Sequence, residues 1–536
     1  MTNIDGTTRR GLLRGLAAAG GMVTAWQAMN GFRPLPQGAL AAVPETPANV
    51  GRGKTVIVLG AGVGGICAAY ELERKGYTVI VLEAASHAGG RSLTLRRGDT
   101  FQEMGGPVQR CTFEEGGWMN AGPGRIPHHH VNVVDYCRSL GVTLEPYIFS
   151  SRANLTTRGI PVEGQPRVAL PTGRVLNDLR GEIAAMLDRC MKMSSTDRDP
   201  RLTAMLAEFG GLSKPANPDD PWPYTNASGR AGYVTPPGVL VPPPQPLDPI
   251  PLQDMLKSEV WKESVFRETR YYWQSSLMQP VGGMDMFWKG FLRQKLAHQP
   301  GRTVANLIRY NAPAWQIQLG ADKVTVWVGA PGTNARFTAD FCISTIPMPV
   351  FAKLRTNLDD TVMKAAASIK ATPSGKVGWQ AERFWEAPGT DIFGGISWVD
   401  GLADQVWYPS DGFLSHLGVL TGAYMSGKKA EAFNAKPIDE RMRLSRAAID
   451  GLQPGSGAKL KHGVAIAWEK MEHIQMGFLD EDDEDFKRLA TILAAPQGGR
   501  LFQAGDQLTW LSGWQEGAIL TAKQAVGDIV RRTGPG

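Results

Sequence analysis

The sequence has few cysteines, and their positions exclude several kinds of site. The five cysteines lie far apart along 536 residues, and no two of them form a CxxC pair. This spacing does not indicate a disulfide framework, a thiolate metal site or a redox-active pair, so we expect mostly buried free thiols. The histidine run 128–130 is not expected to bind a metal either, because successive side chains on a helix point about 100° apart.

Dense basic clusters and long apolar runs are also lacking. The formal net charge is +6, and residues 1–41 alone contribute +3 through four arginines and one aspartate. The rest of the chain carries the remaining +3 without a dense cluster of lysines and arginines, so no nucleic acid partner is predicted. The apolar run from Leu12 to Val23 is shorter than the roughly 20 residues that span a bilayer, so no integral membrane association is expected.

The N-terminal segment does carry a pattern of its own. Residues 8–13, Thr-Arg-Arg-Gly-Leu-Leu, resemble a twin-arginine export motif, and residues 39–41 fit a small-x-small cleavage site. We therefore predict a signal peptide over residues 1–41 and an exported protein, periplasmic or secreted. The alternative is an ordinary helix with a chance arginine pair, such as the pair Arg96-Arg97.

A strand, a glycine-rich turn, a helix and a second strand follow. Residues 55–59 and 78–82 are continuous apolar, β-branched runs, typical of parallel strands that are buried on both faces. Gly60 permits a tight turn, Gly62 lets the backbone approach a pyrophosphate, and Gly65 lets the helix lie close to the strand. The pattern predicts a dinucleotide-binding unit.

An acidic residue completes this unit. Glu83 ends the second strand, 18 residues after Gly65. Its carboxylate is placed to accept the ribose hydroxyls of an adenosine, while the helix N-terminus attracts the phosphates. These features predict that an adenosine diphosphate moiety is bound, but they do not separate NAD from FAD.

Two further motifs resemble the flavin amine oxidase family. Residues 83–92 resemble its E-A-x-x-x-x-G-G-R-x stretch, and residues 501–506 with 513–518 are similar to its F-x-A-G-E/D…G-W-x-x-G-A signature. The resemblance is closest to bacterial L-amino acid oxidases that carry a twin-arginine signal. It implies FAD as the cofactor, held at its pyrophosphate, ribityl and pyrimidine groups by Gly90, Arg91, Gly505, Asp506, Gln515 and Ala518.

The resemblance also implies the fold. We expect an α/β protein with a Rossmann-like FAD-binding domain of the glutathione-reductase type, and an α+β substrate-binding domain with a helical insertion. The FAD-binding domain would be discontinuous, formed by residues 54–125, 280–345 and 490–532. Residues 346–489 would form the substrate-binding domain, and residues 126–279 a helical substrate-entrance region. The proline-rich segment 236–251 within it could cover the substrate domain, edge the entrance or face another subunit.

One arginine is predicted to hold the substrate. Residues 121–127 resemble the G-P-x-R-x-P segment of L-amino acid oxidases, in which the arginine binds the substrate carboxylate. The resemblance makes Arg125 the anchor, with Gly122 and Gly124 letting the chain run close to the flavin. A guanidinium suits this role because it pairs with a carboxylate through two parallel hydrogen bonds. Two alternatives are open: Arg125 is a structural residue paired to an internal acid, or Arg110 is the anchor.

Three more residues acquire roles through the resemblance. Lys376 matches the lysine that holds a water against flavin N5 and assists the reaction with oxygen, although it could also be an exposed strand lysine. Tyr408 matches a tyrosine that offers a second hydrogen bond to the carboxylate, and a buried aromatic at a strand end is the alternative. Trp514 would form a wall above the amino group.

The predicted activity is FAD-dependent oxidative deamination of L-α-amino acids. Its products would be 2-oxo acids, ammonia and hydrogen peroxide, with molecular oxygen as the second substrate. The alternatives are an amide-forming L-amino acid 2-monooxygenase, an amine oxidase for substrates without a carboxylate, and a flavin-binding protein without turnover. The sequence is compatible with a homodimer or a higher homo-oligomer.

Overall fold

The computed structural model describes residues 49–157, 169–193, 200–257, 267, 273–274, 276–480 and 482–534. The predicted signal peptide, residues 1–41, lies outside the described residues. No helix among the residues described is both long enough and apolar enough to cross a membrane.

A parallel sheet of five strands forms one side of the molecule. Its order is β13-β2-β1-β17-β26, and every pairing within it is parallel. The strands come from distant parts of the chain, so the sheet forms only when these parts come together. Their bounds are Thr55–Leu59 (β1), Thr78–Leu82 (β2), Ile308–Arg309 (β13), Phe341–Ser344 (β17) and Leu501–Gln503 (β26).

The alternation of side chains along β1 sends apolar groups to both faces of this sheet. Val56 and Val58 pack in one core with helices α2 (Val63–Arg74) and α13 (Gln515–Thr533). Ile57 and Leu59 pack in a second core on the other face. Both faces are therefore covered, as expected for a parallel sheet.

The second core moves the expected boundary between the two domains. It includes apolar side chains of α8 (Met348–Phe351), α9 (Asp360–Ser368) and α12 (Phe486–Ala494). These helices pack against the strand residues Ile57 and Leu59, so the FAD-side core continues past residue 345 and begins again before residue 490. The boundaries expected at these two points are wrong, because the helices bury their apolar faces against the parallel sheet. A small sheet, β16-β15-β14-β18, adjoins the same core and is formed by Arg336–Ala339, Val324–Val328, Ala314–Leu319 and Arg355–Thr356.

A seven-stranded sheet forms the second part of the molecule, in the order β24-β20-β23-β22-β21-β8-β9. Helices α10 (Gly427–Asn434) and α11 (Ile438–Leu452) pack on it. The two strands at one end of this sheet, β8 and β9, come from the region that was expected to be helical, so that region also contributes to the sheet. The strands are Lys461–Ala467 (β24), Ser374–Glu382 (β20), Leu417–Ser426 (β23), Gln405–Tyr408 (β22), Gly395–Trp398 (β21), Leu155–Thr156 (β8) and Leu170–Pro171 (β9).

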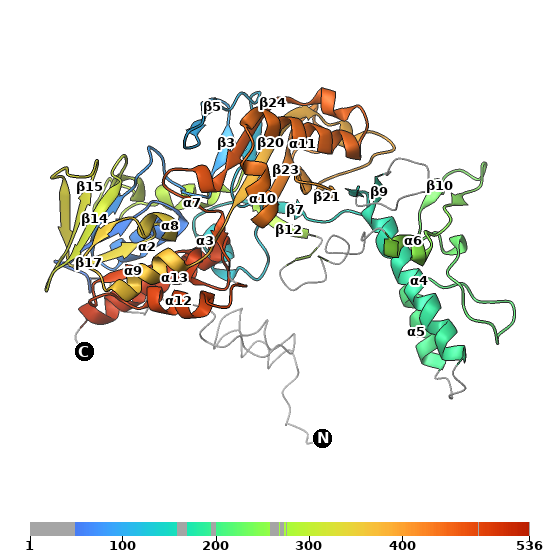
Figure 1. Cartoon of the computed structure of the whole chain (residues 1–536), viewed down its shortest axis with the longest axis horizontal. Helices are drawn as coiled ribbons and strands as arrows, with labels where there is room; N and C mark the ends of the chain where they lie inside the picture. The colour runs from blue at the N-terminus through green and yellow to red at the C-terminus, as the bar shows by residue number, and fades with distance from the viewer. Residues whose placement is uncertain are drawn as a thin grey trace, which may run out of the picture.

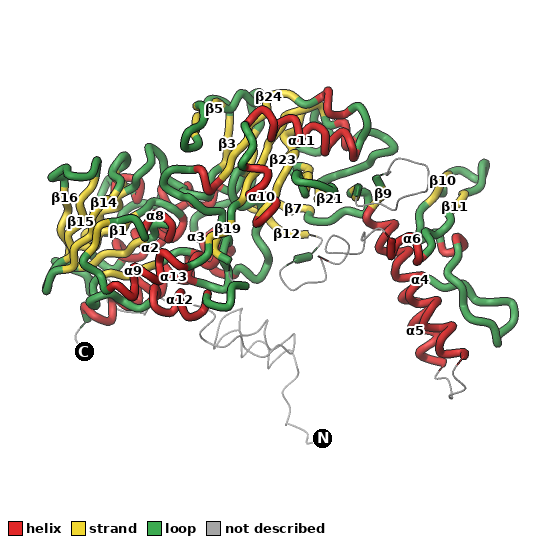
Figure 2. Tube along the Cα trace, in the orientation of Figure 1, coloured by secondary structure: helices red, strands yellow, loops and turns green. Residues whose placement is uncertain are grey.

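The chain leaves this sheet at β9 and forms an arm, defined here as residues 172–257. Helices α4 (Thr172–Met193) and α5 (Pro200–Gly210) lie along each other, and α6 (Leu252–Lys257) packs on α4. Figure 1 shows that the arm extends away from the rest of the chain, on the side opposite to the parallel sheet. Figure 2 shows that the chain between α5 and α6 is mostly loop.

The proline-rich segment 236–251 belongs to this arm. Its strand Gln245–Pro246 (β11) pairs with Tyr233–Thr235 (β10), and the Ile250 N–H donates to Asp178 of α4 over 3.0 Å. Val239, Leu240 and Val241 at the tip of the segment are 76%, 95% and 80% exposed. The segment contributes no residue to the large cavity described below.

Candidate active site

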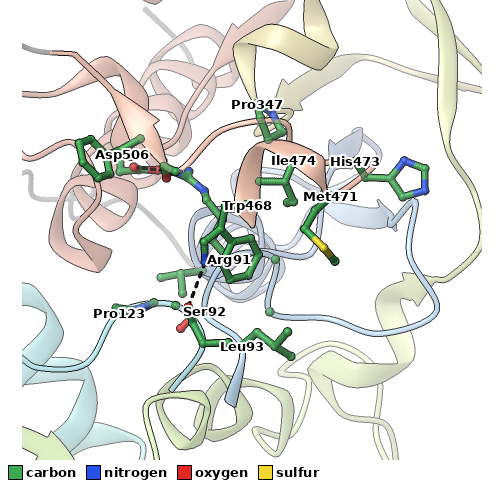
Figure 3. Close-up of a pocket in the computed structure, with 18 of the residues that line it drawn as sticks. Arg91, Ser92, Leu93, Pro123, Pro347, Trp468, Met471, His473, Ile474 and Asp506 are labelled. Atoms are coloured by element: carbon green, nitrogen blue, oxygen red, sulfur yellow. Dashed lines mark hydrogen bonds and ion pairs between the residues drawn. The ribbon is translucent and has the colours of Figure 1, made fainter. Parts of the chain in front are cut away.

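A cavity of about 1020 Å³ lies where the two parts of the molecule meet. Its lining includes the C-terminal ends of β1 and β2, the turns that follow them, and residues of the seven-stranded sheet. The C-terminal edge of a parallel sheet is where α/β proteins bind their ligands. Figure 3 shows that Arg91, Asp506 and Trp468, from widely separated chain segments, gather around one part of this cavity.

The end of the cavity next to the parallel sheet is formed largely by the glycine-rich turn after β1. Gly60 has a φ of 98°, and Gly62 has no atom within 4 Å of the place where a side chain would start. Gly65 does not line the cavity; a Cβ there would lie 1.9 Å from the carbonyl oxygen of Gly60. Gly65 therefore lets α2 begin close to β1.

Glu83 lies beside this turn, and each of its carboxylate oxygens already accepts one hydrogen bond. Its Oε2 accepts from the Ala61 N–H over 2.6 Å, and its Oε1 accepts from the Ala85 N–H over 2.8 Å. Each carboxylate oxygen can accept a second hydrogen bond. Since the first turn of α2 has no acidic residue and no side-chain cap, its N–H groups are available to an anion. These residues fit the diphosphate and ribose of a dinucleotide.

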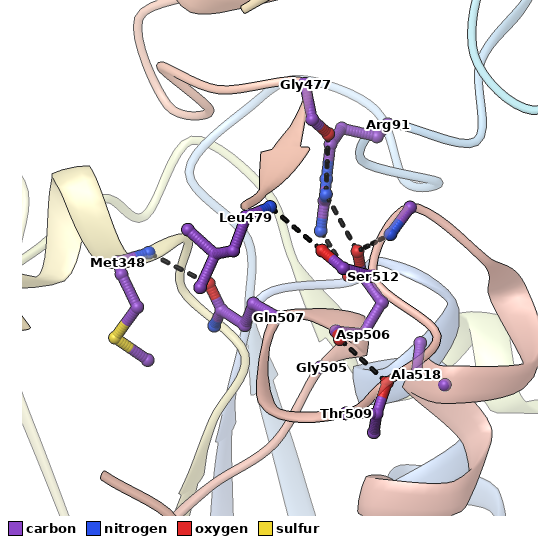
Figure 4. Close-up of polar contacts among 12 residues, drawn as sticks. Arg91, Met348, Gly477, Leu479, Gly505, Asp506, Gln507, Thr509, Ser512 and Ala518 are labelled. Carbon is purple, nitrogen blue, oxygen red and sulfur yellow. Dashed lines mark hydrogen bonds and ion pairs between the residues drawn. The ribbon is translucent and has the colours of Figure 1, made fainter. Parts of the chain in front are cut away.

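An ion pair closes the floor of the cavity. Arg91 binds Asp506 through both guanidinium nitrogens, with Nη1 at 3.0 Å from Oδ2, and Nη1 also donates to the Gly477 carbonyl over 2.8 Å. The Gly513 N–H donates to Asp506 over 2.8 Å. Figure 4 shows Arg91 reaching from its own loop to both partners. The pair fixes the glycine-rich turn at Gly90 to the C-terminal motif.

Helix α13 begins at the same floor. Its residues Gln515 and Ala518 and the preceding Gly505 line the cavity. Gln515 Nε2 donates to the Ser92 hydroxyl over 2.6 Å, which again joins the two motifs. Trp514 and Gln515 at the start of α13 line the cavity, and no side chain caps this helix end, so it suits an electron-rich group such as a flavin pyrimidine.

The other end of the cavity is aromatic and carries Arg125. The Arg125 Cζ lies 4.5 Å from the ring centre of Trp273, 4.6 Å from that of Trp407 and 5.3 Å from that of Phe149. Its Nε is buried and has no hydrogen-bond partner, and no carboxylate in the described part of the chain forms an ion pair with it. The described residues therefore offer no support for the alternative of a structural arginine paired to an internal acid.

Arg110 lies elsewhere. It is exposed on the hairpin of β4 (Thr100–Gln102) and β5 (Val108–Arg110), opposite Thr100. It is not among the residues that line the cavity, whereas Arg125 is. Gly122 and Gly124 also line it, and Gly124 allows the chain to pass the Trp407 ring, since a Cβ there would lie 2.9 Å from a ring carbon.

Lys376 is buried on β20 and is not an exposed strand lysine. Its Nζ donates to the carbonyls of Asn120 and Gly122 over 2.8 and 2.6 Å, and it lies 4.3 Å from the ring centre of Trp407. Burial, assisted by the charge of Arg125, holds the pKa of this amine well below its ordinary value. Lys376 thus fixes the segment that carries Arg125.

Tyr408 does not lie at this site. It packs in the core under α11, at 6.1 Å between ring centres from Trp385, and burial raises its pKa to about 12. Successive side chains of a strand point to opposite faces, so its neighbour Trp407 faces the cavity instead. Tyr424 of β23 also lines the cavity, 4.6 Å from Trp407 between ring centres. The assignment of Tyr408 as a carboxylate ligand is wrong, and the alternative of a buried aromatic holds.

Trp514 lines the cavity and contacts Trp273 at 5.5 Å between ring centres. Behind it lies His130, at 4.9 Å between ring centres, whose pKa is lowered to about 3 by burial and by the neighbouring histidines. Within the described ranges, no cluster of three or more His, Cys, Asp or Glu side chains could hold a metal ion.

Glu516 connects the two ends of the cavity, and no sequence motif predicted this role. It accepts from the Asn132 and Val133 N–H groups over 3.1 and 2.9 Å and so caps α3 (Val131–Ser139), the helix that follows the Arg125 segment. Lys523 of α13 donates to the Asn132 side chain over 2.9 Å. The substrate end is thus fixed to the first turn of α13.

Four cysteines, 67, 111, 137 and 342, are buried free thiols, while Cys190 is exposed.

The chain is similar to known proteins over most of its length. The family model described as flavin-containing amine oxidoreductase matches residues 63–220 and 262–530. An L-amino-acid oxidase of Vipera ammodytes ammodytes is 25% identical over 497 residues, which cover 89% of this chain and 93% of the relative. A putative L-amino-acid oxidase of Bacillus subtilis is 23% identical over 500 residues, covering 89% and 95%.

Solved structures give the same fold. A putrescine oxidase bound to putrescine and a cyclohexylamine oxidase from Brevibacterium oxydans each superpose with a TM-score of 0.57 and 17% identity, covering 89% of this chain and 99% of theirs. The family match extends over most of the chain, and the cavity fits a dinucleotide. The chain therefore belongs to the flavin-containing amine oxidoreductase family and is an oxidoreductase with FAD as its cofactor.

Proposed function

We propose that the protein catalyses the oxidative deamination of L-α-amino acids to 2-oxo acids, with release of ammonia and hydrogen peroxide. One observation carries the proposal: the guanidinium of Arg125 lies at the aromatic end of the cavity without a carboxylate partner among the described residues. The L-amino-acid oxidases among the relatives support the same substrate class.

The surroundings of Arg125 favour an anionic ligand. A guanidinium that is partly removed from water gains most from a charged partner, and it can hold a carboxylate by two parallel hydrogen bonds. The three aromatic rings around it restrict its movement and exclude water, which strengthens that pairing. A carboxylate fixed at this point orients the rest of the substrate, and orientation is a large part of catalysis.

Lys376 would help to keep this geometry. Its hydrogen bonds to Asn120 and Gly122 hold the loop from which Arg125 projects. Burial and the charge of Arg125 lower the pKa of this amine, which favours its neutral form, and a neutral amine has a lone pair that can accept a hydrogen bond from a water. Trp514 would close the cavity on the side of α13. Bound FAD supplies the two-electron oxidation of the amine and the subsequent reaction with oxygen.

An amine without a carboxylate is the main alternative, because the structural neighbours are named for putrescine and cyclohexylamine. Arg125 argues against it, since a positive charge at that position repels an alkylammonium ion and a diamine even more. Among amino acid substrates, an amide-forming monooxygenase would use the same anchor and differ only in its products.

The test is anaerobic bleaching of the flavin with L-amino acids, D-amino acids and simple amines, followed by product analysis after air is admitted. We expect L-amino acids to bleach the flavin, and 2-oxo acid with peroxide to appear in air. Bleaching by simple amines but not by L-amino acids would overturn the proposal. An amide with one carbon fewer than the substrate would identify a monooxygenase.

We also propose that residues 1–41 direct export, on the basis of the arginine pair and the cleavage pattern. Fractionation of cells that express the full chain should place the protein outside the cytoplasm. An Arg9→Lys/Arg10→Lys variant should stay inside. A native chain that remains in the cytoplasm would refute this proposal.

A further inference from the structure

The wall of the cavity next to Arg125 carries more polar groups than an α-amino carboxylate requires. Gln405 and Trp407 alternate along β22 and both line the cavity, as do Asp404 and Lys429. Gln405 is 5% exposed, so its amide is buried in this wall. Burying an amide and charged groups costs free energy unless they are bonded, so their contacts indicate what the wall can hold.

A continuous chain of contacts leads from the anchor to these polar groups. Arg125 lies over the Trp407 ring, with Cζ at 4.6 Å from the ring centre, and the Trp407 Nε1 donates to Gln405 Oε1 over 2.9 Å. Gln405 Nε2 donates to Asp404 Oδ2 over 3.3 Å. Lys429 forms an ion pair with Asp404 through Oδ1. One indole ring therefore separates the carboxylate anchor from a buried amide and an ion pair.

The backbone at Asp404 is fixed in an uncommon conformation. Its φ is 58°, in the left-handed region that Asp and Asn adopt more readily than other residues with a side chain. The Asp404 carbonyl accepts from the Val399 N–H over 2.8 Å, which closes the turn between β21 and β22. Residues in such conformations cluster at ligand sites, where the surrounding structure compensates for the strain.

We infer that Asp404, Gln405 and Lys429 form the subsite for the substrate side chain, and that this subsite takes a neutral carboxamide, as in L-glutamine. The inference rests on the proposed function, because it requires the α-carboxylate to lie on Arg125. The side chains of Gln405 and Trp407 begin about 7 Å apart on one face of β22, so a substrate side chain of several atoms is needed to reach from one to the other. A carboxamide can donate to the second lone pairs of Asp404 and can accept from the remaining N–H groups of Lys429.

Charged and apolar side chains fit these groups less well. The donors Gln405 and Lys429 both already bond to Asp404, so a substrate carboxylate that reached either would lie against a second carboxylate. A substrate ammonium group would have to displace Lys429. Arg267 adds another positive charge to the lining, with its Cζ at 5.1 Å from the Trp273 ring centre. An apolar side chain would take water from the ion pair without replacing its hydrogen bonds, whereas an amide is neutral and can bond to both charges.

Specificity ratios of the FAD-loaded full chain test the inference. For the native enzyme, kcat/KM should be higher for L-glutamine than for L-methionine, L-glutamate or L-lysine. Asp404→Asn keeps a residue type suited to the positive φ and removes the carboxylate beside Lys429. The ratio of kcat/KM for glutamine to that for glutamate should therefore fall about 10-fold or more. Lys429→Met removes the ammonium partner of Asp404, so the ratio for glutamine to lysine should fall by a similar factor.

Lys428→Met is the matched control, because this neighbouring lysine is exposed and does not line the cavity. It should keep the native ratios. A native enzyme that favours methionine, glutamate or lysine over glutamine would overturn the inference. Variants at Asp404 and Lys429 that change all four kcat/KM values by the same factor would also overturn it, since the pair would then have only a structural role. If no L-amino acid is oxidised, the proposed function itself fails; if methionine is oxidised and glutamine is not favoured, only the subsite fails.

Discussion

The two ends of the cavity differ in whether their charged side chains are paired. At the nucleotide end, Arg91 and Asp506 neutralise each other, and Glu83 is held by two backbone N–H groups. At the substrate end, Arg125 has no carboxylate partner within the described part of the chain, and Lys376 donates only to carbonyls. The contrast teaches that ion pairs build the frame of this site, whereas the guanidinium of Arg125 is left for a charged ligand.

Removing Arg125 should have the largest effect of the changes at the two ends of the cavity. Arg125→Ala should lower kcat/KM for L-amino acids by 10²-fold or more, because a lost charged pair corresponds to roughly 3 kcal/mol. FAD content should not change, since the nucleotide end is separate. Steady-state kinetics of purified holoenzyme measures this, with Arg110→Ala as the exposed control. Equal activity of Arg125→Ala and the native enzyme would place the anchor elsewhere.

At the nucleotide end, the corresponding change is Asp506→Ala. It leaves Arg91 without its partner and the Gly513 N–H without an acceptor. We expect the Kd for FAD to rise about 10- to 100-fold, which corresponds to roughly 1.4–3 kcal/mol. Fluorescence titration of the apoprotein with FAD measures it. Asp528→Ala, which breaks the exposed ion pair with Arg531, should bind FAD like the native protein. An unaltered Kd for Asp506→Ala would show that the pair is not part of the frame.

The buried amine of Lys376 should appear in the pH dependence of stability. The unfolded chain holds this proton up to a pKa of 10.5, while the folded protein releases it at a lower pH. Stability should therefore rise with pH between the two pKa values, by up to about 1.4 kcal/mol per pH unit. Denaturant unfolding at a series of pH values below 10.5 should show this slope reduced in Lys376→Met and kept in Lys461→Met. Identical slopes in both variants and the native protein would mean that Lys376 stays charged.

The smallest effects concern two neighbours on β22. Trp407→Leu removes one ring beside Arg125 and should lower kcat/KM by about 2- to 30-fold, in line with roughly 0.5–2 kcal/mol for a cation–π contact. Tyr408→Phe should change it by less than about twofold, because the ring packs away from the cavity. Kinetics on the same amino acid compares the pair. A larger loss in Tyr408→Phe would restore Tyr408 as a substrate ligand.

The nucleotide end was predictable because it depends on local sequence. Gly60, Gly62 and Glu83 follow strands at fixed spacing, and backbone geometry requires these residue types there. The Arg91 and Asp506 motifs are equally local, and their contact follows once both bind the same cofactor.

The substrate end depends on contacts that local patterns do not encode. Tyr408 was misassigned because successive residues of a strand face opposite sides, and only the packing against α11 decides which of them faces the cavity. Phe149 and Trp273 come from segments without a motif. Glu516 lies inside a recognised motif, but its partner Asn132 in α3 is 384 residues away in the sequence. The domain boundaries failed for the same reason, since α9 and α12 are placed by their packing.

The parallel sheet has a consequence for the order of events during synthesis. Its last strand, β26, is followed by Asp506 and then by helix α13, which supplies Gln515 and Ala518 to the floor of the cavity. Asp506 pairs with Arg91, which lies 415 residues earlier in the sequence. The ribosome must therefore complete both of these segments before the floor of the cavity can form around the cofactor. Complete loading with FAD is therefore expected only after α13 has been made, because a chain without this helix keeps the glycine-rich turn and Glu83 but lacks part of the floor of the cavity.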